Sequence, residues 1–152
     1  MSEDRVAALE AKLAALEQRL QRREDELDVR SLQYLYGYLI DKCMYDQVVD
    51  LFAEDGEVRF FGVVWRGKER VRRLYVDRFR KRFTHNTNGP IDGFLLDHPQ
   101  IQTIITISED GRTANLRGRS TMQAGRHVDY QGDAPHLKVR QWWEGGLYEN
   151  TY

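Results

Sequence analysis

Leucines recur at alternating spacings of four and three residues through the first 28 positions of the chain. The series consists of Leu9, Leu13, Leu16, Leu20 and Leu27, with Arg23 at one position of the same series. This spacing places the leucines on one face of an α-helix, and such a face has to be buried. The pattern therefore predicts a helical arm over residues 1–28 that packs on its own domain or, as we expect, on a neighbouring subunit.

Beyond the arm, the pattern predicts a single domain over residues 29–152. Asp28 is a potential cap for a second helical segment. Hydrophobic periodicity then indicates helices at residues 29–44, 46–52 and 67–83, and a strand hairpin at 57–65 that turns at Gly62.

The C-terminal half alternates in the manner of strands. A Gly/Pro/Asn-rich loop is expected at residues 84–97, followed by strands at 98–107, 112–124 and 136–152. Helices followed by a long antiparallel meander are typical of an α+β fold, with the helices on one face of a curved sheet.

Composition narrows the class of protein. The chain has 152 residues, 41% hydrophobic residues and a net charge of -1, so no overall field favours nucleic acid or a membrane surface. A basic stretch at 66–82 is interpreted as a solvated helix face rather than a nucleic-acid site. One cysteine, Cys43, excludes an internal disulfide, and no apolar stretch is long enough to span a bilayer. We expect a cytoplasmic protein.

Cofactor motifs are absent from the sequence. There is no Gly-rich phosphate loop, and Gly145-Gly146 lies within a predicted strand. The histidines at 85, 98, 127 and 136 show no metal-ligand spacing with one another or with Cys43. We therefore expect chemistry without metal or cofactor.

Asp41 is an ionisable residue in an apolar segment, YLYGYLIDKCMYD. Burying its carboxylate costs free energy unless another group pairs with it. Tyr34, Tyr38 and Tyr45 recur with Asp41 at helical spacing and predict one polar, aromatic stripe. The alternative is an exposed aspartate at a helix end.

Two predicted strands carry polar residues on one face. Alternation groups His98 with Gln100, Gln102 and Ile104, on a face that is ligand-lined or simply solvated. On the last strand, Trp142, Glu144, Gly146, Tyr148 and Asn150 share one face, and Trp143, Gly145, Leu147 and Glu149 the other. Gly145-Gly146 indicates a bulge or a close approach.

Three segments resemble the SnoaL-like, scytalone-dehydratase-like branch of the NTF2-like superfamily. They are LYGYLIDKCMYDQVVDLFAEDGEVRF (with Tyr36, Asp41, Asp46 and the LFAED ending), ISEDGRTANLRGR and WWEGGLYENTY. The resemblance implies a cone, in which helices pack on a strongly curved antiparallel sheet around one pocket. The family usually continues into another strand, so an end at Tyr152 would leave an open sheet edge.

The resemblance also implies a site. Asp41 and His98 match the pocket aspartate and strand histidine of scytalone dehydratase, and Tyr36 matches an oxyanion-stabilising tyrosine of ketosteroid isomerase. In two places the chain departs from the dehydratase: Ile40 replaces a tyrosine, and the second histidine falls near Ala124.

The sequence therefore predicts a cofactor-independent lyase, a dehydratase or a retro-aldol enzyme, acting by general acid–base catalysis on a small hydroxylated aromatic or polyketide-like molecule. The candidate catalytic residues are His98, Asp41 and Tyr36, and the candidate substrate-binding residues are Tyr38, Gln100, Trp142, Glu144 and Tyr148. The alternative is a non-catalytic small-ligand-binding or assembly protein. Self-association as a dimer or trimer is expected; nucleic-acid and membrane partners are not.

Overall fold

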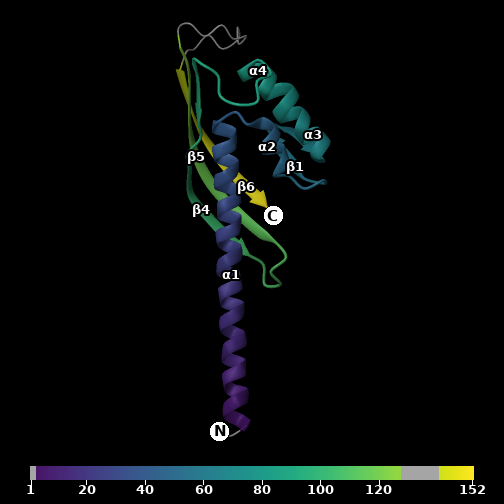
Figure 1. The fold of residues 1–152 in the computed structure, drawn as a ribbon, viewed down its shortest axis with the longest axis vertical. Coiled ribbons are helices and arrows are strands. Elements are labelled where there is room, and N and C mark those ends of the chain that lie inside the picture. The colour runs from purple at the N-terminus through teal and green to yellow at the C-terminus, as the bar shows by residue number, and fades with distance from the viewer. Residues whose placement is uncertain (1–2, 128–140) are drawn as a thin grey trace.

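The computed structural model describes residues 3–127 and 141–152. Its first element, α1 (Glu3–Asp41), is one uninterrupted helix that leaves the body of the protein as a long arm (Figure 1). The predicted start of a new helix after Asp28 is wrong. The sequence around Asp28 contains no Gly or Pro, and Glu26 pairs with Arg23 and with Arg30 across the expected break. Where the arm ends and the domain begins stays a prediction.

The chain turns at Cys43 into a second helical layer. Helix α2 (Tyr45–Asp50) comes first, slightly earlier than the predicted 46–52. The predicted helix over 67–83 is confirmed as a continuous helical stretch, but its centre is a π-helix, an uncommon form. Its parts are α3 (Lys68–Arg72), η1 (Arg73–Arg80) and α4 (Lys81–Thr84).

A small hairpin connects α2 to α3. Strands β1 (Glu57–Phe60) and β2 (Val63–Arg66) pair antiparallel, which confirms the predicted hairpin. Phe61 and Gly62 form its turn, both with positive φ (46° and 77°). Two such residues make the tight turn that suits the twist of a hairpin.

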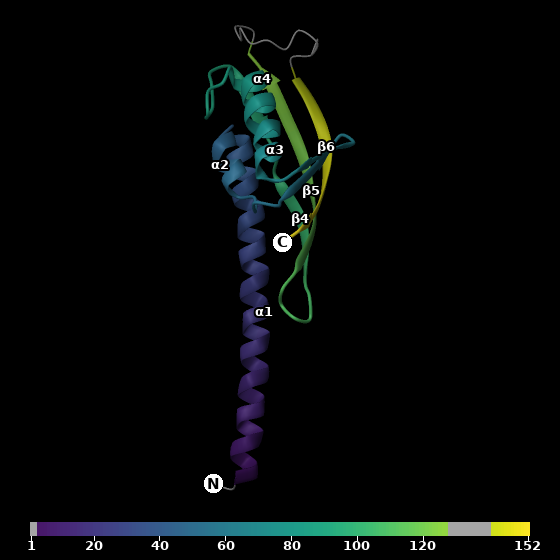
Figure 2. The same cartoon turned by 90° about the vertical axis from the view of Figure 1, so that its right-hand side faces the viewer.

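The main sheet is antiparallel and built around β5 (Ala114–Arg126). Strands β3 (Phe94–Asp97) and β4 (Gln100–Ile107) pair with successive parts of one edge of β5, and β6 (Gln141–Thr151) pairs with the other edge. The helices lie on one side of this sheet (Figure 2). The predicted loop over 84–97 is therefore too long, because its last four residues form β3. Residues 136–140 of the predicted last strand lie outside the described part of the chain.

The core fills the space between the helical layer and the sheet. Its buried members include Val48 and Leu74 from the helices and Leu96, Leu116 and Ala124 from the sheet. The predicted alternation along β6 is confirmed, since Trp142 and Tyr148 are half-buried whereas Trp143 and Leu147 are exposed. Within the described residues, no helix has the length and apolar character needed to cross a membrane.

The predicted common face of His98, Gln100, Gln102 and Ile104 is wrong. A β-bulge shifts the β4–β5 register between Ile101 and Ile104, and Gln102 adopts a positive φ of 53°. A bulge adds one residue to a strand and reverses the alternation beyond it. Gln100 therefore stays half-buried, whereas Gln102 and Ile104 are exposed.

Candidate functional site

Asp41 and His98 form an ion-pair-like contact at the junction of α1 and the sheet. Oδ1 of Asp41 lies 2.8 Å from Nδ1 of His98 and also accepts the His98 backbone N–H at 2.8 Å. Their side chains are only 13% and 15% exposed. One carboxylate oxygen therefore fixes both the backbone and the ring of the histidine.

His98 reaches this position because the edge of the sheet is interrupted between β3 and β4. His98 and Pro99 lie between β3 and β4, so the His98 N–H is free to bond to Asp41 instead of β5. The side chain of Gln100 donates to the His98 carbonyl at 2.7 Å. Both polar groups of the His98 backbone thus have side-chain partners.

Gly37 allows α1 to approach β4 closely. A Cβ at this position would lie 2.6 Å from Cγ of Gln100, which is too close for any side chain. Glycine inside a helix ordinarily costs about 1 kcal/mol relative to alanine. Here it permits the contact that keeps Gln100 beneath His98.

A chain of hydrogen-bonded polar side chains extends from Gln100 through the buried Gln33 to Asn150 and Tyr152. Gln33, 1% exposed, donates to Gln100 at 2.7 Å and accepts from Asn150 at 2.7 Å and from Tyr152 at 2.8 Å. Sequence reasoning missed Gln33 and gave Asn150 no role. The available signal was a glutamine four residues before Gly37 on the same helix face.

A shallow depression of about 170 Å³ lies beside the pair. It is lined by Tyr34, Gly37, Tyr38, Asp41, His98, Pro99 and Gln100. A carboxylate can only accept hydrogen bonds, so the ring proton of His98 belongs on Nδ1 and the Nε2 lone pair remains for another group.

Tyr36 belongs to a separate, interior tyrosine cluster. Its hydroxyl lies 3.1 Å from that of Tyr75, and its ring packs edge-on against Tyr148 with centroids 6.0 Å apart. Burial and then repulsion from Tyr75 and Tyr148 hold the pKa of Tyr36 well above its usual value. Burial likewise raises the pKa of Tyr75 and Tyr148. These phenols therefore remain proton donors.

The remaining candidate residues lie in different places. Tyr38 borders the depression and is exposed, and Gln100 supports His98. Tyr148 interacts with Gln100 and Tyr36 and belongs to the tyrosine cluster rather than to the lining of the depression. Trp142 packs beside Ala124 and under the guanidinium of Arg126, whereas Glu144 is exposed opposite Met122.

The predicted stripe through Tyr34, Tyr38, Asp41 and Tyr45 is wrong at its last member. The helix ends at Asp41, and Cys43 turns the chain with a positive φ of 53°. Tyr45 therefore starts α2 and is completely buried.

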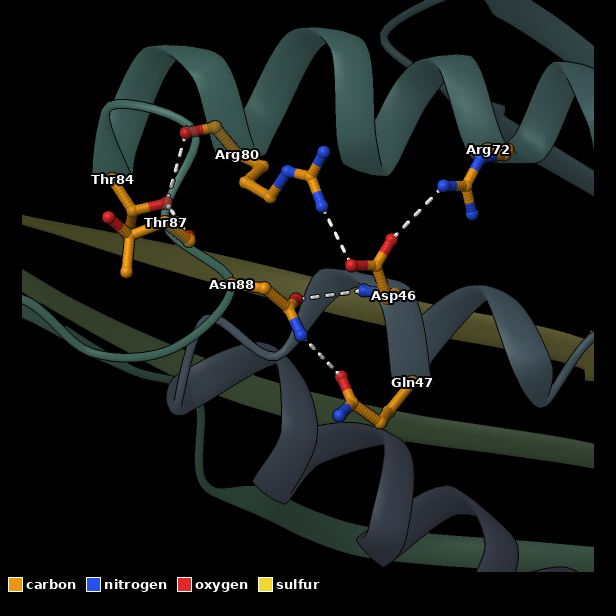
Figure 3. Close-up of polar contacts among 7 residues, drawn as sticks. All are labelled: Asp46, Gln47, Arg72, Arg80, Thr84, Thr87 and Asn88. Carbon is orange, nitrogen blue, oxygen red and sulfur yellow. Dashed lines mark hydrogen bonds and ion pairs between the residues drawn. The ribbon is translucent and has the colours of Figure 1, made fainter.

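Asp46, part of the first of the three segments that resemble the family, connects helices and does not line the depression. It accepts from Arg80 of η1 at 2.7 Å and lies 3.4 Å from Arg72 of α3, so it ties α2 to both elements (Figure 3). Asn88 accepts from the Asp46 N–H at 3.0 Å and donates to Gln47 at 2.9 Å. These bonds anchor the loop that leads to β3 and thus to His98.

Residues 3–127 and 141–152 contain no group of three or more His, Cys, Asp or Glu side chains placed to hold a metal ion. Beside Asp41 and His98, the polar side chains that line the depression are those of Gln100, Tyr34 and Tyr38. Proton transfer and hydrogen bonding are the chemistry that these groups offer.

Helices packed on one side of an antiparallel sheet give the protein an α+β cone of the NTF2-like kind. Residues 21–152 match the SnoaL-like domain, so the chain belongs to the SnoaL-like family, which includes polyketide cyclases and dehydratases. A search of curated proteins finds no match.

Two solved structures have the same fold. ActVI-ORFA from Streptomyces coelicolor is similar with a TM-score of 0.56 and 14% identity, over 83% of this chain and 82% of that one. An NTF2-like protein with a cystatin-like fold from Novosphingobium aromaticivorans is similar with a TM-score of 0.57 and 22% identity, over 93% and 76% of the two chains. At these identities the likeness concerns the fold alone.

Proposed function

We propose that the protein is a cofactor-independent lyase that uses His98 and Asp41 for general acid–base catalysis on a small hydroxylated aromatic substrate. The observation that carries this proposal is the 2.8 Å contact between Nδ1 of His98 and Oδ1 of Asp41, beside a depression with aromatic walls. Family membership supports it, because the family includes dehydratases.

In this mechanism, Nε2 of His98 takes a proton from the substrate while Nδ1–H stays bonded to Asp41. The carboxylate stabilises the imidazolium that forms. In a dehydration, the proton comes from carbon and returns to the departing hydroxyl, which leaves as water. In a retro-aldol-type cleavage, the proton comes from a hydroxyl and the carbon–carbon bond breaks to give an aldehyde. The electron pair left on carbon either takes back the proton or, in a 1,3-diol, forms a double bond while the neighbouring hydroxyl takes the proton and leaves as water. Neither route needs an oxidant or a reductant.

Tyr38 and Tyr34 would supply the aromatic walls, and Tyr148 would help to hold Gln100 in place behind the depression. Tyr36 holds Tyr148 from the interior side, so its role is to position rather than to touch the substrate. Trp142 and Glu144 lie farther along β6 and would contact only a larger substrate.

The test uses two probes with different products. A 1,2-diarylpropane-1,3-diol reports cleavage by formaldehyde release, and a β-hydroxy aryl ketone reports dehydration by the absorbance of the conjugated enone. We expect one of them to turn over with the wild type and to lose at least 10²-fold in rate with His98→Ala.

The matched control is His127→Ala, because His127 is exposed and does not line the depression beside His98. It should retain the wild-type rate. Equal turnover by His98→Ala and the wild type would refute the proposed role.

A non-catalytic small-ligand-binding protein is the second candidate. It is favoured by the departure from the dehydratase pattern, because the position of the second histidine falls near Ala124, which is an apolar residue buried in the core. It predicts saturable binding of the same aromatic probes, measured by calorimetry, without product formation by any variant.

A further inference from the structure

The arm carries an exposed apolar stripe that nothing in the described part of the chain covers. Leu13, Leu16 and Leu20 are 57–60% exposed, and the full stripe is Val6, Leu9, Leu13, Leu16, Leu20 and Leu27. The β4–β5 hairpin touches the helix on another face, where Arg22 donates to the carbonyl of Glu109 at 3.2 Å. The stripe therefore points away from the protein's own sheet.

The charged residues beside the stripe have a regular order. Arg5, Lys12 and Arg19 each directly precede one seam leucine or valine, and Glu10, Glu17 and Glu24 each directly follow the other seam position. In heptad terms the basic residues occupy g and the acidic residues e. Each basic residue is followed by its acidic counterpart five positions later.

We propose that this stripe docks on the same stripe of a second copy of the chain, as a parallel two-stranded coiled coil. In a parallel pair, g of one helix meets the following e of its partner. All three such contacts join a base to an acid: Arg5 with Glu10 of the second copy, Lys12 with Glu17, and Arg19 with Glu24.

The opposite orientation brings like charges together. In an antiparallel pair, g meets g and e meets e, so lysine and arginine would face each other, as would the glutamates. The same pattern that supports the parallel pair therefore disfavours the antiparallel one. The arm over residues 3–28 spans roughly 40 Å at 1.5 Å per residue.

Between Val6 and Leu27, Arg23 is the one charged residue in the seam. Its guanidinium already turns to Glu26, at 2.8 Å, and its side chain is 78% exposed. A long side chain can lay its methylenes along an apolar seam while its charge stays in water. The open edges of a two-stranded coil allow this, whereas a three-stranded core buries the position more deeply.

The stripe also extends to the candidate site. Tyr34 continues the heptad series beyond Leu27, Tyr38 lies one turn later, and both are exposed (46% and 60%) and border the depression beside His98. A parallel pair therefore brings the two depressions to the same end of the dimer, each close to the α1 of the second copy.

The first experiment exchanges the charges in the full-length protein. One variant carries Arg5→Glu, Lys12→Glu and Arg19→Glu; the other carries Glu10→Lys, Glu17→Lys and Glu24→Lys. By sedimentation velocity, the wild type should have twice the mass of one chain, each triple variant should shift to the mass of one chain, and an equal mixture should regain the doubled mass. A monomeric or trimeric wild type, or triple variants that remain as dimeric as the wild type, would overturn the proposal.

The second experiment tests orientation. The only native cysteine, Cys43, is buried. Leu9→Cys should form a disulfide-linked dimer under mild oxidation, whereas Ala11→Cys, on the outer face, should not. Efficient crosslinking between Leu9→Cys and Leu20→Cys chains, without Leu9→Cys homodimers, would show an antiparallel pair and contradict the assignment.

Discussion

At the scale of single residues, Asp41 combines a feature from each of the two alternatives that the sequence left open: it lies at a helix end, and its carboxylate is paired. It is the last residue of α1, as a helix-end aspartate would be, yet it is only 13% exposed and bonds twice to His98. A helix end is where the chain can present a carboxylate to a neighbouring strand. Asp41 is therefore placed by the end of its own helix and held by His98, which lies 57 residues away in the sequence.

Asp41→Asn should separate orientation from charge. An amide oxygen still accepts the His98 N–H groups but no longer stabilises an imidazolium, so we expect kcat to fall about 10²-fold or more with KM and the thermal midpoint little changed. Steady-state kinetics on whichever probe the wild type converts provides the measurement. A variant with wild-type kcat would show that the charge plays no part.

The tyrosine cluster predicts a loss of stability in alkali. The folded protein holds the protons of Tyr36, Tyr75 and Tyr148 more tightly than the unfolded chain does, because their pKa values are raised. This contribution is complete below the unfolded pKa of about 10 and is lost as pH rises above it. Thermal midpoints from pH 8 to pH 11 should fall, and less steeply in Tyr36→Phe. Identical pH slopes would contradict the prediction.

The pairing of Asp41 with His98 could be predicted only from the family resemblance. No spacing rule connects a helix end with the break between two strands, because the contact is set by how α1 crosses the sheet. Gln33 and Gln100 show the same limit. Each is an unremarkable glutamine in the sequence, and their hydrogen bond exists because the fold brings them within 2.7 Å.

At the scale of elements, periodicity identified the helices and strands but not their irregularities. The bulge at Gln102 reversed the face of β4, and nothing in the run QIQTIITI signals it. For α1 the opposite happened: the sequence offered a signal, the possible capping residue Asp28, but the helix continues through it. A capping residue such as Asp28 does not start a new helix when the residues on both sides of it favour continuation of the existing one.

The close approach of α1 to β4 can be tested with Gly37→Ala. Alanine should gain about 1 kcal/mol of helix propensity, but the clash with Gln100 should cost about 1–3 kcal/mol. We expect a net loss of roughly 1 kcal/mol in the free energy of unfolding, measured by urea denaturation. Gly145→Ala is the control, because a Cβ there meets nothing within 4 Å. Equal effects of the two substitutions would argue against the close contact.

The anchor between α2 and η1 predicts a smaller effect. Asp46→Asn weakens its pairing with Arg80 and Arg72, partly exposed groups, so the free energy of unfolding should fall by about 1 kcal/mol. Asp50→Asn, on the exposed side of the same helix, should change it little. A more stable Asp46→Asn protein would show that desolvating this carboxylate costs more than its ion pairs return.

At the scale of the whole molecule, the arm and the site are parts of one helix. The residues that carry the leucine stripe and Asp41 belong to α1, so association of two arms would also fix the surroundings of the depression (Figure 1). The amphipathic arm was readable from sequence because helical periodicity is local. The sequence also favoured a neighbouring subunit as its partner, which stays a prediction. The structure adds that the protein's own domain leaves the stripe exposed.

Association predicts a stability that depends on concentration. If two folded chains bind each other, mass action raises the thermal midpoint as protein concentration rises. We expect this rise in the wild type and its loss in the variant with Arg5→Glu, Lys12→Glu and Arg19→Glu, both followed by circular dichroism. A wild-type midpoint that is constant over a hundredfold dilution would contradict it.

The central claim is that Asp41 holds His98 through Nδ1 and leaves Nε2 to accept a proton. The most direct measurement is the ¹⁵N NMR spectrum of the His98 side chain at a pH where its ring is neutral. We predict a proton on Nδ1 and an unprotonated Nε2 in the wild type, with this preference lost in Asp41→Ala. A wild-type ring that carries its proton on Nε2 would contradict the claim.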